Sequence, residues 1–342
     1  MVRPIEPPEF IRNSALNPVI DVRSPGEFSQ GHIPGAVNIP VFTDAERAVV
    51  GTLYVNSGRE EAILKGLDTA LPKTGGYLEL LHEACPCGTI LLYCWRGGLR
   101  STLMAEVFSH AGYHVDLLKG GYKAYRQFIR NGLAQPVRIM VLGGFTGSGK
   151  TELLKAIAEK GEQVVDLEGL ACHKGSVFGA LGQPCQPTNE QFENNLYARW
   201  LELDHSRLIW IEDESRMIGK VTLPDPVVEH LSNSPMIRVQ LDVNIRINRL
   251  VTEYSVFEKQ ALSGAIRKIG ERLGGEKTRE AIAALESDRF EVVAALSLSY
   301  YDKAYLFSVS RRRCKKIFDL LISGTDIETD AKKIIELAGQ SQ

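Results

Sequence analysis

A cysteine followed closely by two arginines and two glycines is the first stretch whose residue types could carry out chemistry. It reads Cys94-Trp-Arg96-Gly-Gly-Leu-Arg100-Ser101 and comes directly after the apolar run Thr89–Tyr93. Where a strand passes into a helix, the backbone N–H groups and the helix N-terminus favour an anion. Arg96 and Arg100 add positive charge, which favours a thiolate or an oxyanion bound beside it. A lone cysteine is often only a small buried hydrophobe, but these neighbours predict a reactive Cys94.

A glycine-rich loop that ends in lysine and threonine is the second such stretch. It reads Gly144-Phe-Thr-Gly147-Ser-Gly149-Lys150-Thr151 and fits the pattern G-x-x-x-x-G-K-S/T in full. In this motif the backbone N–H groups surround a phosphate chain, the lysine neutralises its charge and the threonine hydroxyl can bind Mg²⁺. The loop therefore predicts a site for a di- or triphosphate. It does not say whether a nucleotide, another diphosphate or an RNA phosphate occupies that site.

Three acidic residues follow a later apolar run and offer a possible metal contact. They are Glu212, Asp213 and Glu214, directly after Leu208–Ile211. Asp213 or Glu212 could hold a metal ion through water, and we place Asp213 among the phosphate-binding residues. Acidic residues after a strand are also common as helix caps, so this alternative stays open.

The two loops require strands and helices that alternate along the chain. Continuous apolar runs predict strands buried in parallel sheets, and amphipathic stretches between them predict helices. The predicted strands are 18–22, 89–93, 115–118, 137–142, 163–166, 207–211 and 236–241; the predicted helices are about 59–67, 76–83, 100–110, 122–131 and 151–160, with mostly helical sequence from 244 to about 301. This order predicts an α/β protein built from two tandem α/β domains.

The length and the connector Gly132–Pro136 agree with two domains. A chain of 342 residues exceeds one ordinary domain, and Gly and Pro are typical of linkers. We therefore predict a first domain over residues 1–135 and a second over residues 136–342, the latter with a helical part near its end.

Composition limits the classes of partner and compartment. The formal net charge is -2, so a nucleic acid would have to be held by local clusters of Lys and Arg. No apolar run is long enough to span a bilayer, and Met1–Phe10 lacks the apolar segment of a signal peptide. We expect a cytoplasmic protein with reduced thiols and without a membrane partner.

The remaining cysteines do not complete a metal site. Cys85-Pro-Cys87 has no second pair, and Cys172-His173 has the same weakness. We predict no zinc site and no tightly bound cofactor, with Mg²⁺ as a candidate ion at the phosphate loop.

The first domain carries a long stretch that resembles a known family. Asp21-Val-Arg23-Ser-Pro-Gly-Glu27-Phe-Ser-Gln-Gly-His32-Ile-Pro-Gly-Ala-Val-Asn-Ile-Pro40 is similar to the N-terminal signature of the rhodanese family. The resemblance implies a rhodanese-like parallel-sheet domain, followed here by a P-loop NTPase-like domain. It also implies that Cys94 carries sulfur or selenium as a persulfide-type intermediate. Asp21, Arg23, Glu27 and His32 are expected to hold loops together rather than react.

A rhodanese-like domain joined to a P-loop domain resembles the tRNA 2-selenouridine synthase family over essentially the whole chain. Further similar stretches are the cysteine loop 94–101, Gly120–Tyr125, Asp166–Leu170 with His173–Ser176, and Leu208–Arg216. Trp95 is a departure, because the loop in this family tends to carry a smaller residue there. The bulk of this side chain puts access to the thiol in doubt, but it leaves Cys94 and both arginines in place.

The resemblance implies a two-step modification of the wobble uridine of tRNA. Geranyl diphosphate first alkylates the sulfur of 2-thiouridine, and selenium from selenophosphate then replaces the S-geranyl group. The phosphate loop, with Gly144, Gly147, Gly149, Lys150, Thr151 and Asp213, suits the diphosphate. Cys94 with Arg96 and Arg100 suits the selenophosphate step, as carrier or nucleophile.

Basic clusters near the end of the chain are candidates for binding tRNA. The densest has Arg311, Arg312, Arg313, Lys315 and Lys316. A second lies along a predicted helix with Arg267, Lys268, Arg272 and Lys277, where a solvated surface is an equally good explanation. Tyr300, Tyr301 and Tyr305 could stack an exposed base, although such tyrosines more often pack inside.

Three other functions compete with this reading. An ATP-dependent sulfurtransferase would use a Cys94 persulfide and would show tRNA-dependent nucleotide turnover. A non-catalytic regulatory module would tolerate Cys94→Ser, and the arginines and glycines of the loop argue against it. A small-molecule kinase would explain the phosphate loop and leave the first domain without a role.

Overall fold

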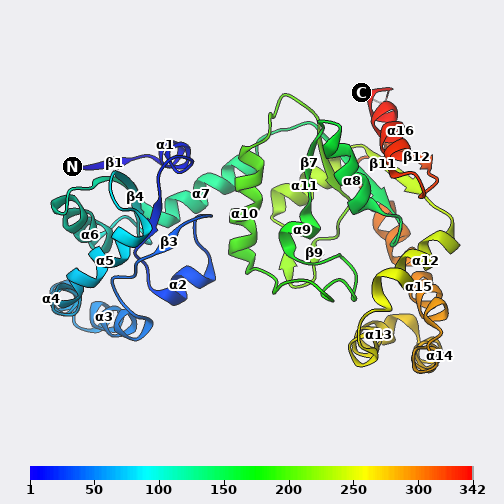
Figure 1. Cartoon of the computed structure of the whole chain (residues 1–342), viewed down its shortest axis with the longest axis horizontal. Helices are drawn as coiled ribbons and strands as arrows, with labels where there is room; N and C mark the ends of the chain where they lie inside the picture. Colours follow the sequence, from blue (N-terminus) through cyan, green and yellow to red (C-terminus); the bar gives the residue numbers. More distant parts are fainter. Residues whose placement is uncertain (341–342) are drawn as a thin grey trace. The chain divides into compact units, whose positions relative to one another are not determined.

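The computed structural model describes residues 1–340. The chain divides into two compact units, Met1–Leu133 and Ala134–Gln342. Each unit is built on its own five-stranded, all-parallel sheet with helices packed on it (Figure 1). The expected α/β class with parallel sheets is therefore confirmed.

The first unit has the strand order β1-β5-β4-β2-β3. Its elements in chain order are β1 (Val2–Ile5), α1 (Pro7–Asn13), β2 (Val19–Asp21), α2 (Pro25–Gln30), β3 (Val37–Asn38), α3 (Asp44–Asn56), α4 (Arg59–Ala70), the 3₁₀ turn η1 (Leu71–Lys73), α5 (Thr74–Ala84), β4 (Thr89–Tyr93), α6 (Leu99–His110), β5 (His114–Leu118) and α7 (Gly121–Leu133). Helices α2 and α3 each begin with a capping box, in which a Ser or Thr at the N-cap and a Glu three residues later satisfy the first N–H groups.

The central strand β4 is covered on both faces. Ile90 and Leu92 pack in one cluster with residues of α5 and α6. Tyr93 points the other way and contacts Phe10 of α1 and Tyr122 of α7. This alternation follows from the two-residue period of a strand. It places Cys94, the next residue after the strand, on the α6 side.

The second unit has the strand order β12-β11-β6-β8-β7. Its elements in chain order are β6 (Ile139–Gly144), α8 (Lys150–Glu159), β7 (Gln163–Val165), α9 (Leu167–Ala171), α10 (Asn189–Leu201), β8 (Ile209–Glu212), β9 (Met217–Ile218), β10 (Val221–Thr222), α11 (Asp225–Asn233), β11 (Met236–Gln240), α12 (Val243–Tyr254), α13 (Lys259–Leu273), α14 (Gly275–Glu286), α15 (Phe290–Ser310), β12 (Ile317–Leu321) and α16 (Ile327–Gln340). The strands β9 and β10 form a separate short antiparallel pair.

Two helices from opposite ends of this unit cover one face of its sheet. Side chains of α8 and α16 share one buried cluster with Leu142 of β6, Trp210 of β8 and Val239 of β11. Helices α13, α14 and α15 gather around a second apolar cluster, away from the sheet (Figure 1). The helical stretch expected from 244 to about 301 is thus confirmed as α12–α15. Strand β12 then returns to pair with β11 at the edge of the sheet.

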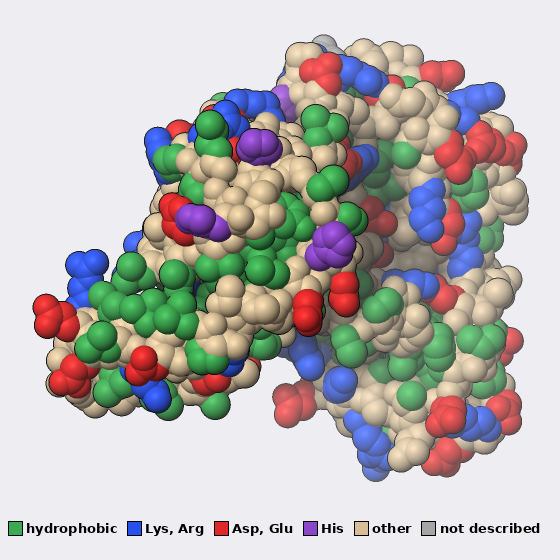
Figure 2. Space-filling view, turned by 60° about the vertical axis from the view of Figure 1, so that its left-hand side comes forward, with side chains coloured by type: hydrophobic (Ala, Val, Ile, Leu, Met, Phe, Trp, Pro, Cys, Tyr) green, Lys and Arg blue, Asp and Glu red, His purple; other side chains and the backbone are tan. Residues whose placement is uncertain are grey.

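Charged side chains of both signs are interspersed on the face shown in Figure 2, in keeping with the small net charge. Among residues 1–340, no helix combines the length and apolar character needed to cross a bilayer.

Candidate functional site

The cysteine loop of the first unit is closed by the start of helix α7. The N–H groups of Tyr122 and Lys123 donate to the carbonyl oxygens of Cys94 and Trp95 at 2.8 and 3.0 Å. Gly121 has φ +61°, and a Cβ there would lie 2.3 Å from the Cys94 carbonyl oxygen. Only glycine fits this close approach of two backbones. The pair Gly120-Gly121, matched in sequence only as part of the family resemblance, therefore has a structural reason.

The Cys94 thiol lies almost fully buried under this loop and faces Ser101. Its Sγ lies 3.1 Å from the Ser101 hydroxyl oxygen and 3.9 Å from the Gly98 carbonyl oxygen. Cys94 is one of the residues that line a cavity of about 430 Å³, together with Trp95, Gly98 and Leu99. The buried thiol therefore lies beside this cavity, and Trp95 forms part of the cavity wall.

Three arginines line the same cavity, one more than the sequence indicated. Arg96 is exposed, and Arg100 donates to Glu27 at 2.6 Å. Arg47 reaches the cavity from α3, far away in sequence, and its Nε lies 3.8 Å from the Glu27 carboxylate. Although burial opposes ionisation, the Arg100 guanidinium lowers the pKa of Glu27. Nothing in the local sequence around Arg47 marks it, because only the packing of α3 brings it here.

Asp21 and Arg23 hold the neighbouring loops from inside. Arg23 is fully buried, and its Nη2 donates to Asp21 and to the Gly31 carbonyl oxygen, both at 2.6 Å. Its guanidinium carbon also lies 3.9 Å from the centre of the Tyr122 ring, a cation–π contact. These contacts agree with the expectation that Asp21 and Arg23 hold loops together rather than react.

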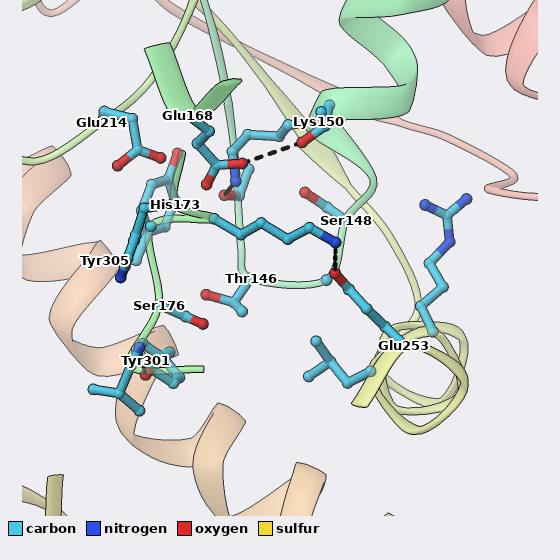
Figure 3. A pocket seen from close by; sticks show the side chains of 18 of the residues that line it. Thr146, Ser148, Lys150, Glu168, His173, Ser176, Glu214, Glu253, Tyr301 and Tyr305 are labelled. Carbon is cyan, nitrogen blue, oxygen red and sulfur yellow. Dashed lines mark hydrogen bonds and ion pairs between the residues drawn. The ribbon is translucent and has the colours of Figure 1, made fainter. Parts of the chain in front are cut away.

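The phosphate loop of the second unit connects β6 to α8, as its motif requires. Gly147 and Gly149 both have φ +79°, a left-handed conformation that favours glycine. The Lys150 ammonium donates to the Gly144 carbonyl oxygen at 3.2 Å, and the Thr151 hydroxyl donates to Glu168 at 3.2 Å. The loop lines a cavity of about 1510 Å³ (Figure 3). A phosphate chain placed there would meet the loop N–H groups, Lys150 and the N-terminus of α8.

Three glutamates lie together beside the loop. Oxygens of Glu168, Glu212 and Glu214 all lie within 4.8 Å of one another. Glu212 is fully buried, and its Oε1 accepts from the Glu168 N–H at 2.7 Å, whereas its Oε2 has no partner within residues 1–340. Burial and the neighbouring carboxylates raise the pKa of Glu212 well above its usual value. Figure 3 shows Glu168 and Glu214 on the same side of the pocket as Lys150. Such a set of carboxylate oxygens, next to the Thr151 hydroxyl, suits Mg²⁺.

The sequence pointed to Asp213 or Glu212 as the metal contact; it placed Glu214 beside them without giving it a role, and it did not single out Glu168. Glu168 and Glu214 both lie in stretches that resemble the family, which is the one signal that marked them. Their meeting depends on α9 following β7 and on the loop after β8, which no local pattern reveals.

Replacing Glu214 with glutamine is expected to stabilise the metal-free protein. Burial and the Glu168 carboxylate raise the pKa of Glu214 to about 8, from 4.5. The folded state therefore keeps a proton that the unfolded chain releases, so stability falls as pH rises from about 4.5 to 8. In EDTA at pH 8, the variant should have a higher free energy of unfolding than the wild type, because glutamine has no charge to bury, and its Tm should rise by a few degrees. Thermal unfolding across this pH range checks the shift.

The exposed Glu159→Gln serves as the control and should leave both Tm and its pH dependence unchanged. A lower Tm for the Glu214 variant, or an unaltered pH dependence, would contradict the prediction.

Asp213 does not join this cluster, which departs from the expected contact with a metal or phosphate. Its carboxylate accepts from Arg312 at 2.8 Å, and both side chains are largely buried. Arg312 also donates to the carbonyl oxygens of Leu231 and Ser234, at 2.5 and 3.0 Å. Although burial raises the pKa of Asp213, Arg312 opposes the rise. Asp213 still lines the large cavity, but the Arg312 guanidinium pairs with its carboxylate.

The basic run is therefore split between surface and interior. Arg312 was expected to bind RNA, and its burial corrects that expectation, because an interior guanidinium cannot reach a phosphate of a docked tRNA. Arg311, Arg313, Lys315 and Lys316 are exposed and remain candidates. The sequence could not separate them, because side chains in an irregular stretch have no fixed period.

Truncating Arg312 is expected to damage stability rather than RNA binding. Arg312→Ala would leave Asp213 buried without its partner, which costs about 3–5 kcal/mol. Arg313→Ala, on the surface, should change stability by less than about 0.5 kcal/mol and should weaken tRNA binding while lowering its salt dependence. Denaturant unfolding and tRNA titrations at two salt concentrations test both. A stable Arg312→Ala protein that has lost tRNA binding would show the assignment to be wrong.

Part of the second basic group and the three tyrosines line the phosphate cavity, whereas Arg267 and Lys277 are exposed and do not line it. Lys268 and Arg272 of α13 line this cavity, and Arg272 donates to the Tyr300 hydroxyl at 3.3 Å. The Tyr301 hydroxyl accepts from the Val177 N–H at 2.8 Å, and Tyr305 packs 5.2 Å from the Phe145 ring. The phenols are thus engaged at the cavity wall, which favours the packing role over base stacking.

Comparison with known proteins finds a matching family for each of the two units. A family model described as the tRNA 2-selenouridine synthase AAA domain matches residues 137–324, and one described as a rhodanese-like domain matches residues 6–128. The chain is 34% identical to a tRNA 2-selenouridine synthase of Nitrosomonas europaea, covering 89% of this chain and 92% of that one. Proteins of the same name from Bdellovibrio bacteriovorus and from Sulfurovum sp. are 34% and 35% identical, over 92% and 90% of this chain and 93% of each of theirs.

Proposed function

Because the chain belongs to the tRNA 2-selenouridine synthase family, we propose that it converts 2-thiouridine to 2-selenouridine at the wobble position of tRNA through an S-geranyl intermediate. The cosubstrates in this proposal are geranyl diphosphate and selenophosphate. The observation that carries it is the presence in one chain of a diphosphate-type loop and an arginine-lined thiol cavity.

The second unit would carry out the geranyl transfer. The 2-thiouridine sulfur attacks the first carbon of the geranyl group, and the carbon–oxygen bond breaks as diphosphate leaves with the electron pair. Lys150 and the N–H groups of the loop would hold this leaving group and neutralise its growing charge.

A magnesium ion fits the donor set next to the loop. Glu168, Glu214 and the Thr151 hydroxyl would hold it, and the unpaired oxygen of buried Glu212 marks a place where a cation is electrostatically favoured. The ion, when bound, supplies charge neutralisation for the departing diphosphate.

The first unit would handle selenophosphate. Its selenium replaces the S-geranyl group at the same carbon of the base, geranylthiol departs, and water releases the phosphate. Arg96, Arg100 and Arg47 would bind the anion within the cavity. Cys94 would act as a nucleophile: its thiolate displaces geranylthiol from the base carbon, and the selenium of selenophosphate then displaces the Cys94 thiolate. S-alkylation helps because it turns a poor leaving sulfur into a good leaving thiol.

We further propose that the exposed residues Arg311, Arg313, Lys315 and Lys316 contact tRNA phosphates.

The test is to incubate the protein with 2-thiouridine tRNA and to omit each cosubstrate in turn. Mass spectrometry of the nucleosides should show S-geranyl-2-thiouridine with geranyl diphosphate alone, and 2-selenouridine only when both are present. ATP-dependent sulfur transfer, with no product from either cosubstrate, would replace this function with a sulfurtransferase.

A further inference from the structure

A second, smaller cavity adjoins the phosphate cavity in the second unit. Thr146 of the phosphate loop, Ser176, Leu250, Tyr254 and Tyr301 line both cavities. In Figure 3, Thr146, Ser176 and Tyr301 lie near one another at one side of the pocket. A ligand held by the phosphate loop can therefore extend directly into the smaller space.

The walls beyond this shared border are largely carbon. Leu262 comes from α13, and Phe290, Val293 and Ala294 come from one face of α15; none of them lines the phosphate cavity. The same helices form a buried apolar cluster around this space. The polar exceptions are Ser255 and Ser297, and the buried hydroxyl of Ser297 has no hydrogen-bond partner among residues 1–340.

The loop motif allows two kinds of diphosphate ester, a nucleoside diphosphate and a prenyl diphosphate. Apolar walls distinguish between them. A ribose or a purine placed here would lose its hydrogen bonds to water without replacement, at a cost of about 1–3 kcal/mol for each polar group. An alkyl chain has no such groups and gains about 0.8 kcal/mol for each buried methylene. The smaller cavity therefore favours an isoprenoid over a nucleoside.

The volume of this cavity also limits the length of the chain. It is about 40 Å³. At about 10–15 Å³ for each water-sized probe, this is room for about three waters, or roughly 90 Å³ of liquid. That is about the space of one isoprene unit, so the second unit of a ten-carbon chain fills this cavity and a third unit finds no room in it.

We propose that this cavity binds the terminal isoprene unit of the prenyl diphosphate and so selects a ten-carbon donor. The assignment rests on the proposed function, because it concerns the substrate of the same phosphate loop. The diphosphate lies on the loop N–H groups and Lys150, the first isoprene unit crosses the border at Thr146 and Tyr301, and the second enters the apolar space.

Two variants with opposite effects on the cavity test the proposal. Ala294→Phe should fill it, and Phe290→Ala should enlarge it. Each is assayed for kcat/KM with dimethylallyl, geranyl and farnesyl diphosphates on 2-thiouridine tRNA. Filling should shift the preference from geranyl towards dimethylallyl by ~10-fold or more, and enlargement should shift it similarly towards farnesyl. Ala295→Phe, at the neighbouring exposed position of α15, is the matched control and should leave the preference unchanged.

Folding is checked separately, by the rise in Tm that magnesium pyrophosphate causes in each variant. If Ala294→Phe does not fold, the donor preference of Phe290→Ala alone tests the proposal. Unchanged ratios among the three donors in a folded variant would overturn the chain-length assignment and leave the proposed function intact. A wild-type protein that transfers no prenyl group from any donor would instead overturn the proposed function.

Discussion

With Cys94 replaced by alanine, the protein is expected to stop at S-geranyl-2-thiouridine. The variant keeps the phosphate loop and its carboxylates, so geranyl transfer should proceed at its normal rate. The selenium step should fall to the rate without enzyme, because the nucleophilic thiol beside the arginine-lined cavity is gone. The measurement is the ratio of the two nucleosides by mass spectrometry, with both cosubstrates present.

The matched control is Cys87→Ala, an exposed thiol of the same unit. It should form 2-selenouridine as the wild type does. Normal 2-selenouridine formation by the Cys94 variant would remove the thiol from the reaction and leave the arginines as the functional part of the cavity.

Replacing Lys150 with alanine is expected to have the opposite effect on the two steps. Loss of a preorganised positive group at the leaving diphosphate should lower the rate of geranyl transfer by about 100–1000-fold. Supplied with tRNA that is already geranylated, the same variant should still form 2-selenouridine. Single-turnover assays that start from each of the two tRNA substrates separate these effects.

Lys332→Ala, on the exposed side of α16, serves as the control. If the Lys150 variant lost both steps equally while remaining folded, the division of the two half-reactions between the units would be wrong.

The sequence predicted the parts of the fold that rest on continuous patterns. The apolar runs that became β4, β6 and β11, and the amphipathic stretches of α6 and α7, were predicted within a few residues of their observed ends. The reason is that strands buried on both faces must be apolar throughout, whatever their neighbours are. The two motif loops were predicted for a similar reason, since their chemistry needs particular residues in sequence.

Three edge strands, β1, β3 and β12, were not predicted, because an edge strand needs less apolar sequence. Strand β1 contains Arg3 and Pro4, and proline is tolerated where one side of a strand has no partner. Strand β12 has partly exposed residues and follows a run of arginines and lysines. The pairing of β1 with β5 and of β12 with β11 depends on the rest of each sheet being present.

The site was predictable only where its residues are close in sequence. Cys94, Arg96 and Arg100 share one loop, and Gly144–Thr151 share another. Arg47 and Glu168 reach these loops through the packing of separate elements, so local spacing contains no sign of them. For Arg312 the sequence was misleading. A run of basic residues indicates a surface, but Arg312 pairs with the buried carboxylate of Asp213.

The contact of Glu27 with Arg100 and Arg47 has a consequence for selectivity. The carboxylate is tethered at the start of α2 by its capping box, so it acts as an internal competitor for any anion that enters the thiol cavity. A chloride or bicarbonate ion brings one charge and can do little more than exchange places with it. An anion with several charges can displace the Glu27 carboxylate, because it binds all three arginines at once. We therefore expect the thiol cavity to discriminate against the small, singly charged anions that are commonest in a cell.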